Sequence, residues 1–344
     1  MIAAIAVADL TGDELDVQFH SFQDSRDATV LSPTVDLTKD FTDRTTLKAK
    51  FGVDAISAAS DSCVRCHRPG ATDTRIVAGA TLERKLRGDL KVAAGLEVSH
   101  ENFYQATTLL TSISKDFNKG NTTVAGGYTF SLNRPQLHPS AQTENQFANS
   151  AFASLTQTLT KSTIGQLGYE IDQVNGYQGS PFLRALVNGS RELGVSPDTR
   201  TRHTLSARIR QALPWNTFLE GDYRFYTDSW SLHANGVSGG LSHYVFPELL
   251  LNVSYRYYDQ TGVFFSEPEY FGAPQYFTAD FRLQPFSSGM YTGRFTFTPK
   301  GRVFFLPGGT GFTGEYQFYR STTGFEAAVF TVGLKLPLGT PGTP

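Results

Sequence analysis

The stretch TFLEGDYRFYTDSW, residues 217–230, alternates apolar and ionic side chains along its length. Leu219, Tyr223 and Phe225 fall at odd positions. Glu220 and Arg224 fall at even positions. Since successive side chains of a β-strand point to opposite faces, this pattern predicts a strand with one apolar face and one charged face.

The same alternation recurs in at least three later segments, at 249–259, 275–285 and 289–298. Segments of about ten residues suit a tilted crossing of a membrane better than the ordinary strand of about 5–6 residues. Aromatic pairs also stand near the ends of these segments, where a membrane interface would lie. We therefore expect each segment to cross a lipid bilayer with its apolar face outward.

The connections between the segments alternate between short and long. This asymmetry is typical of the periplasmic turns and outer loops of bacterial barrels. The longest connection is expected at about 176–199, where it would fold over or into the barrel. The short connections fall at 86–89, 118–121, 213–216 and 246–248.

Composition supports the same class of protein and excludes others. Charged residues are 18% of the chain, against about 25% in an ordinary soluble domain. A net charge of −2 and the absence of any run of Lys or Arg argue against a nucleic-acid partner. No apolar run approaches the length of a transmembrane helix, which leaves a closed barrel as the way to cross a membrane.

The fold class predicted is all-β, a transmembrane antiparallel up-and-down barrel in the bacterial outer membrane. Counting gives 17 segments, and since such barrels close with an even number we expect 16 strands, with 18 as the alternative. The uncertain segment is sought within 299–338. A single barrel domain over 9–338 follows, with a tail at 339–344.

The two ends of the chain carry short signals of their own. Residues 1–8, MIAAIAVA, have the form of the end of an export signal, and an ordinary first strand or a disordered terminus is the alternative. Near the other end, TVGLKLPL at 331–338 resembles the closing strand by which outer-membrane barrels are recognised for assembly, without the usual terminal aromatic residue.

Five phrases of the sequence are distinctive: FQDSRDATVLSPTVDL (22–37), VDAISAAS (53–60), DTRTRHTLSARI (198–209), YRFYTDSWSLHANGV (223–237) and YRYYDQTGVFF (255–265). Together they resemble the bacterial outer-membrane proteins grouped as domain-of-unknown-function family 3570. The resemblance implies a location and a fold, and no established activity.

The only two cysteines of the chain stand in DSCVRCHRPG, residues 61–70. Cys63 and Cys66 have the spacing that adds to the two vinyl groups of a haem, and His67 follows as the axial ligand of the iron. This motif predicts one covalent haem c. A disulfide between the two cysteines is the alternative. A zinc site is disfavoured because it would need further ligands, and a redox dithiol is disfavoured because the surrounding sequence is not thioredoxin-like.

The haem would sit in a loop at 58–72, at the outer mouth of the barrel. Its second axial ligand is expected to be His20, on the inner face of the first strand, with His100 as the next candidate. An ordinary solvated histidine is the alternative for either. Because one haem cannot span a core of about 30 Å, it would act as an electron-transfer relay with partner multihaem cytochromes.

The predicted inner faces carry charges of both signs on neighbouring strands. Such charges would set up a field across a water-filled pore, or they would pair and stiffen the wall. No nucleophile or phosphate-loop signature is present, so an enzyme is not expected. The alternative function is a passive porin or structural barrel, in which Cys63 and Cys66 form a disulfide in a loop plug. The inward charges are Arg202, Arg208, Arg210, Glu220, Asp222, Arg224, Arg256, Asp280, Arg282 and Arg294.

Overall fold

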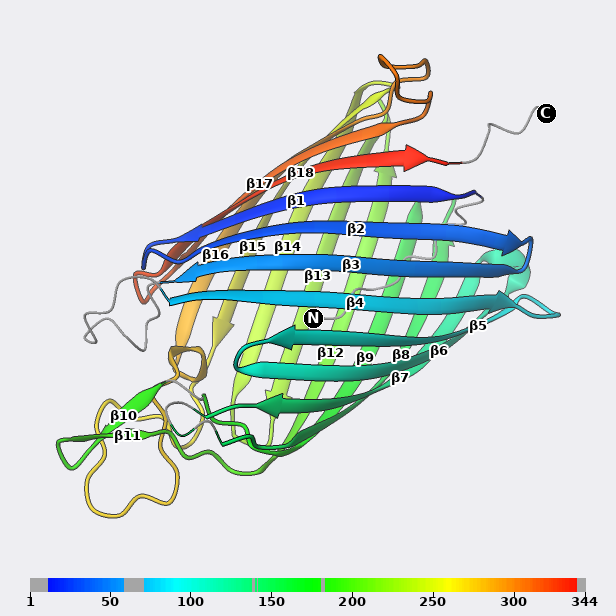
Figure 1. The fold of residues 1–344 in the computed structure, drawn as a ribbon. Helices are drawn as coiled ribbons and strands as arrows, with labels where there is room; N and C mark the ends of the chain where they lie inside the picture. Colours follow the sequence, from blue (N-terminus) through cyan, green and yellow to red (C-terminus); the bar gives the residue numbers. More distant parts are fainter. Residues whose placement is uncertain (1–11, 59–70, 138–139, 141, 181–182, 339–344) are drawn as a thin grey trace.

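The computed structural model describes residues 12–58, 71–137, 140, 142–180 and 183–338. Sixteen strands form one closed barrel, and two short strands, β10 (Arg184–Val187) and β11 (Ser190–Leu193), form a separate hairpin (Figure 1). The first half of the barrel contains β1 (Glu14–Asp24), β2 (Thr29–Thr42), β3 (Thr45–Ala58), β4 (Ala71–Lys85), β5 (Leu90–Glu101), β6 (Tyr104–Phe117), β7 (Thr122–Pro135) and β8 (Gln146–Thr160). The second half contains β9 (Thr163–Gly176), β12 (Thr199–Leu213), β13 (Thr217–Asp228), β14 (His233–Phe246), β15 (Leu249–Gln260), β16 (Phe286–Phe297), β17 (Gly311–Ser321) and β18 (Glu326–Pro337).

Every barrel strand pairs antiparallel with its neighbours, and β9 pairs with β12 across the hairpin. The barrel closes where β18 pairs with β1, from Glu14 opposite Pro337 to Asp24 opposite Ala327. The fold class and the count of 16 strands are therefore confirmed. The segment at 331–338 that resembles a closing signal lies almost wholly within this last strand.

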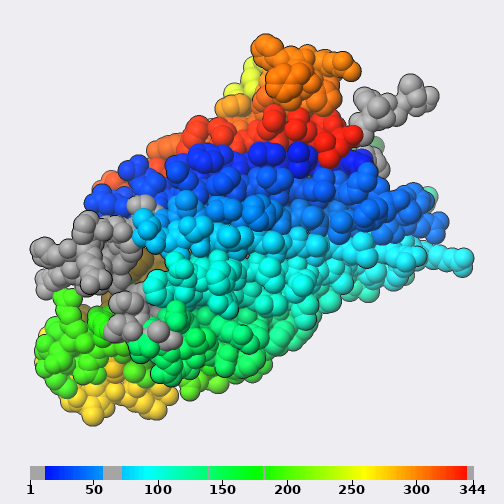
Figure 2. Space-filling view, in the orientation of Figure 1, coloured from blue at the N-terminus to red at the C-terminus, as the bar shows by residue number. Residues whose placement is uncertain are grey.

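The outer surface of the barrel is apolar. Val17 and Phe19 on β1, and Val253 and Tyr255 on β15, are among the large apolar side chains that the wall exposes. Figure 2 shows the wall as a continuous surface over the blue and cyan strands, β1 to β5. An apolar surface of this extent is unsuited to water and suited to lipid, which separates this barrel from a soluble β-sandwich.

The connections differ in length between the two ends of the barrel. At one end they are turns such as 43–44 and 161–162, with one longer segment at 298–310. At the other end lie the long connections, including 136–145, 177–198 and 261–285. Long loops mark the extracellular end of outer-membrane barrels, and we orient the molecule accordingly.

The predicted strand at 275–285 is wrong. These residues belong to the connection 261–285, which includes only a short 3-10 helix, η3 (Phe281–Leu283). In this connection both the apolar Phe277 and the polar Asp280 are buried, so the alternating sequence does not correspond to two faces of a strand. Removing this one segment from the count of 17 gives the observed 16, so the error lay outside the suspected region 299–338.

Most of the buried apolar residues form two clusters, both at the extracellular end. One surrounds Trp230, Val263 and Phe265, and the other surrounds Val187 and Tyr270. We call the described residues of the connections 177–198 and 261–285 the cap; it lies beyond the strand ends at the lower left of Figure 1. The predicted position of a loop over the barrel end is correct, although 261–285 is the longer of the two connections.

Candidate channel and extracellular cap

The inner wall of the barrel is polar and in contact with water. The inward residues of β12 and β13 are the even-numbered ones, since Leu205 and Tyr223 are exposed on the outside. Among the inward groups, the side chain of Arg208 is 36% exposed and that of Glu220 is 35% exposed. A sixteen-stranded barrel is wide enough to hold an aqueous channel, and these exposures are those of side chains that line one.

Part of the predicted lumen charge is neutralised by neighbouring strands. Arg208 contacts Asp222, and its Nε lies 3.6 Å from Glu220 Oε1. Arg210 donates from Nε to Glu220 Oε2 at 3.0 Å. These ladders link β12 to β13, so here the prediction that the charges pair and stiffen the wall is the one that applies.

Arg294 on β16 likewise pairs with Glu315 on β17. Glu315 was not among the predicted charges, although it is the residue directly opposite Arg294. Gln317 Nε2 donates to Glu315 at 2.6 Å, so the carboxylate has two partners. This pair fixes the wall between the two strands.

Three of the predicted lumen arginines have no ion pair with the described residues: Arg202, Arg224 and Arg256. The Arg256 guanidinium lies 5.7 Å from the centre of the Tyr258 ring. Arg224 and Arg256 are exposed, and therefore their charges face the water of the lumen.

Asp280 and Arg282 do not lie on the barrel wall as predicted. They stand at η3 in the cap, where Arg282 Nη2 donates to Asp280 Oδ2 at 2.6 Å. Asp280 also caps η3 by accepting from the Arg282 backbone amide. The hydrogen bond to Asp280 raises the pKa of Arg282. Because the two residues bond to each other at η3, they stabilise the cap and do not line the barrel.

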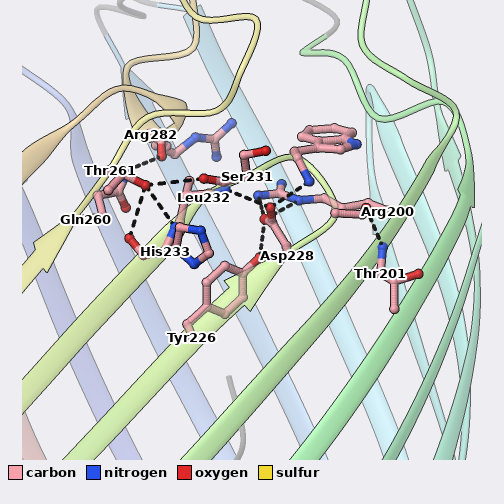
Figure 3. Close-up of polar contacts among 12 residues, drawn as sticks. Arg200, Thr201, Tyr226, Asp228, Ser231, Leu232, His233, Gln260, Thr261 and Arg282 are labelled. Carbon is pink, nitrogen blue, oxygen red and sulfur yellow. Dashed lines mark hydrogen bonds and ion pairs between the residues drawn. The ribbon is translucent and has the colours of Figure 1, made fainter.

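A buried polar cluster joins the cap to the barrel (Figure 3). Asp228 at the end of β13 is its centre, with a fully buried side chain that accepts from Arg200 Nε at 2.8 Å and Tyr226 Oη at 2.7 Å. It also accepts from the backbone amides of Trp230 at 2.8 Å and Leu232 at 3.1 Å. We call Arg200, Tyr226, Asp228 and Trp230 the latch.

Trp230 connects the latch to the cap. Its ring packs edge-on against Phe265, with 5.2 Å between ring centres, and the Phe264 amide donates to its carbonyl at 3.0 Å. The Arg200 guanidinium lies 4.2 Å from the centre of the indole ring. A cation stacked on a tryptophan and held by a carboxylate is a rigid arrangement, so the latch fixes the cap relative to β12 and β13.

The two halves of the cap are also joined to each other. Asn188, in the β10–β11 turn, donates from Nδ2 to the Gly272 carbonyl at 2.7 Å and accepts from the Gly272 amide at 2.8 Å. Val187 and Tyr270 pair as an isolated bridge beside them. The base of 261–285 is closed by Gln260, whose Nε2 donates to the Arg282 and Gln284 carbonyls at 2.9 and 2.6 Å.

The predicted haem residues Cys63, Cys66 and His67 lie outside the described residues. The strands on either side are β3, which ends at Ala58, and β4, which begins at Ala71, both at the extracellular end. The predicted loop 58–72 is therefore the β3–β4 connection, with the strands one or two residues longer than expected.

The histidines predicted as axial ligands differ in their placement. His20 faces the lumen from β1, and its Nδ1 lies 2.9 Å from Thr331 Oγ1 on β18. His100 shares the outward face of β5 with Leu96 and Val98, so it does not face the lumen. Among the described residues, no group of three or more His, Cys, Asp or Glu side chains is arranged to hold a metal ion.

Sequence reasoning missed Arg200 and several lumen carboxylates. Arg200 has the same parity as Arg202 on β12, so the alternation could have found it. Glu97 on β5 alternates with Leu96 and Val98 and could have been found in the same way. None of the described helices is long and apolar enough to cross a membrane.

The geometry defines a class: a closed sixteen-stranded antiparallel barrel with an apolar outer belt and a charged interior, which is the architecture of bacterial outer-membrane barrels, and we assign the chain to that membrane. The chain belongs to the protein family of unknown function DUF3570, whose model matches residues 63–298. Three of the five phrases that resemble this family lie within the matched range.

Solved structures with the same fold include Pseudomonas aeruginosa OccK8 (OprE), with a TM-score of 0.51 and 10% identity over 96% of this chain and 99% of that one. P. aeruginosa OpdK with vanillate gives a TM-score of 0.50 and 8% identity, over 94% and 98%. A bacterial polysaccharide outer membrane secretin gives 0.54 and 11%, over 95% and 98%. No curated protein sequence matches the chain.

Proposed function

We propose that this protein is a channel for small polar solutes in the outer membrane, and not an enzyme. The observation that carries the proposal is the charged inner wall, on which Arg224 and Arg256 are exposed. A wall that was packed to serve only as a scaffold would bury or pair such groups. The cap, fixed by the latch, stands at the entrance and restricts what reaches the lumen.

Planar-bilayer recording of the purified protein tests the channel. Stepwise increases in conductance in potassium chloride are expected, and swelling of proteoliposomes should be faster with small sugars than with large ones. A protein that is folded by the heat-modifiability test and still gives neither steps nor swelling would rule the channel out.

A second candidate function is an electron-transfer relay that carries one haem c and works with partner multihaem cytochromes. The sequence motif Cys63, Cys66 and His67 favours it, because it provides two thiols and an adjacent ligand in the connection between β3 and β4. His20 lies on β1 with its Nδ1 bonded to Thr331, which leaves Nε2 for a second ligand. A disulfide between the cysteines is the competing proposal.

A pyridine haemochrome spectrum tests the relay. A c-type band is expected from protein made in cells that mature cytochromes c, and Cys63→Ser/Cys66→Ser should abolish it while heat-modifiable migration is kept. If the wild-type protein lacks the band and its thiols react with maleimide only after reduction, the disulfide is the correct assignment. Channel recordings on the same double variant show whether the two functions are independent.

A further inference from the structure

Between Ala234 and Ser242, the inner face of β14 carries only small side chains, unlike the faces on either side of it. Val237 and Leu241 are exposed on the outside of this strand, so the even-numbered residues point inward. Ala234 and Gly236, nearest to the cap, are buried, and the next three inward residues are partly exposed. We call these three, Ser238, Gly240 and Ser242, the lane.

Two arginines border the lane, one on each side. Gly236 lies opposite Arg224 on β13, and Ser238 lies opposite Arg256 on β15. The two arginine backbones are thus two strand spacings apart, about 9.5 Å, and offset by two residues, about 7 Å. Both guanidiniums lie within electrostatic range of Tyr258, which stands opposite Gly236 on β15.

Two carboxylates near the lane are already engaged with other arginines, and the inward Glu170 on β9 lies within electrostatic range of Arg224. Asp222 and Glu220 on β13 pair with Arg208 and Arg210 of β12. Arg224 and Arg256 have neither an ion pair nor a hydrogen bond with the described part of the chain. This wall therefore presents positive charge to the lumen.

The wall opposite the lane carries a carboxylate that has no ion pair with the described residues. β5 lies eight strands round the sixteen-stranded barrel from β15, which is the far side. There Glu97 points inward without an ion pair to any described residue. Glu97 therefore places a negative charge across the lumen from the two arginines, in the same row as the inward Lys50 of β3.

We propose that Arg224 and Arg256 make the lane a track for small anions, so that solutes bearing a carboxylate or phosphate group pass along β14. The inference rests on the proposed channel. A guanidinium offers paired N–H donors whose geometry matches both groups, and two of them offset by two residues along the wall allow an anion to pass from one to the next. The small side chains of the lane leave the space that the solute needs.

The ratio of chloride to potassium permeability, from reversal potentials across a potassium chloride gradient, tests the track. Arg224→Gln/Arg256→Gln should lower this ratio about threefold or more. Inorganic phosphate should also reduce the chloride current of the wild type and have less effect on the variant. Arg294→Gln/Glu315→Gln is the control, since it removes one charge of each sign from a paired site and should leave the ratio unchanged.

Three further variants separate the effect of charge from the effect of space. Glu97→Gln should raise the same ratio, because it removes negative charge from the opposite wall. Ser238→Phe should reduce the chloride current by filling the lane, whereas Ser238→Ala should not, since it adds no bulk to this partly exposed position.

The outcomes distinguish the track from the channel. A wild-type protein without pores contradicts the channel itself. Pores whose permeability ratio is the same in the wild type and in Arg224→Gln/Arg256→Gln contradict the track and leave the channel standing. An equal decrease in the permeability ratio in the Arg294→Gln/Glu315→Gln control also contradicts the track. The decrease would then follow from any change to the charges of the lumen.

Discussion

At the scale of single residues, Asp228 is the most heavily engaged side chain of the extracellular end. It is fully buried and accepts hydrogen bonds from Arg200, Tyr226 and the turn that follows it. An ion pair of this kind contributes specificity rather than large net stability, because burying both charges costs nearly what their attraction returns. Removing one partner is different, since the other is left buried and uncompensated.

Asp228→Asn should therefore lower the free energy of unfolding by about 3–5 kcal/mol. Urea unfolding in detergent measures this loss, with the folded fraction read from heat-modifiable migration on a gel. Glu326→Gln is the matched control, since its partner Arg320 is largely exposed and the loss should stay below about 1 kcal/mol. Equal losses in the two variants would show that the latch adds nothing beyond an exposed ion pair.

Gly176, where β9 enters the cap, is the glycine whose backbone is most constrained. Its φ is +101°, and an added Cβ would lie 2.1 Å from the Asn145 carbonyl oxygen. Gly176→Ala should destabilise the barrel by at least about 1–2 kcal/mol through the strained backbone alone. Gly293→Ala, at a site with no atom within 4 Å, should be near neutral. The same unfolding assay compares the two variants, and equal midpoints would contradict the expectation.

At the scale of elements, the alternation of side chains predicts the barrel strands because each one separates lipid from water. The same signal fails at 275–285, where the apolar Phe277 and the polar Thr278 and Asp280 are all buried inside the cap. Periodicity reports which face is buried and not what buries it. Which lumen charge pairs with which was likewise beyond the sequence, because it depends on the register of strands such as β16 and β17.

The cap should loosen when its two halves are separated. Asn188→Ala removes both hydrogen bonds to Gly272, worth about 1–2 kcal/mol, and so should raise the open population about 5–30-fold. Trypsin cleavage at the exposed Arg191, followed by gel analysis of the intact barrel, measures the change. Arg191→Gln in the same background confirms the cleavage site, and an unchanged rate in Asn188→Ala would mean that the apolar cluster alone holds the cap.

At the scale of the whole molecule, the lengths of the connections set the orientation. Sequence alone anticipated this asymmetry and the single barrel, since both follow from where turns and alternating segments fall. The absence of an ion pair at Arg224 and Arg256 could not be anticipated in the same way. Among the described residues it emerges only when all sixteen strands are in register.

Labelling on intact cells tests the orientation. In a Cys63→Ser/Cys66→Ser background, Glu192→Cys on the β10–β11 hairpin should react with a membrane-impermeant maleimide. Lys161→Cys, in the turn between β8 and β9, should react only after the outer membrane is opened. The reverse pattern would invert the assignment of the two ends.

The pairing of β1 with β18 has a consequence for how the protein is made. His20 and Thr331, partners in that pairing, are 311 residues apart in the chain. The cylinder therefore stays open, with two unsatisfied edges, until its final segment has left the ribosome and crossed the inner membrane. Biogenesis must proceed with the whole polypeptide held unfolded in transit, and premature termination anywhere would yield an aggregation-prone product rather than a smaller pore.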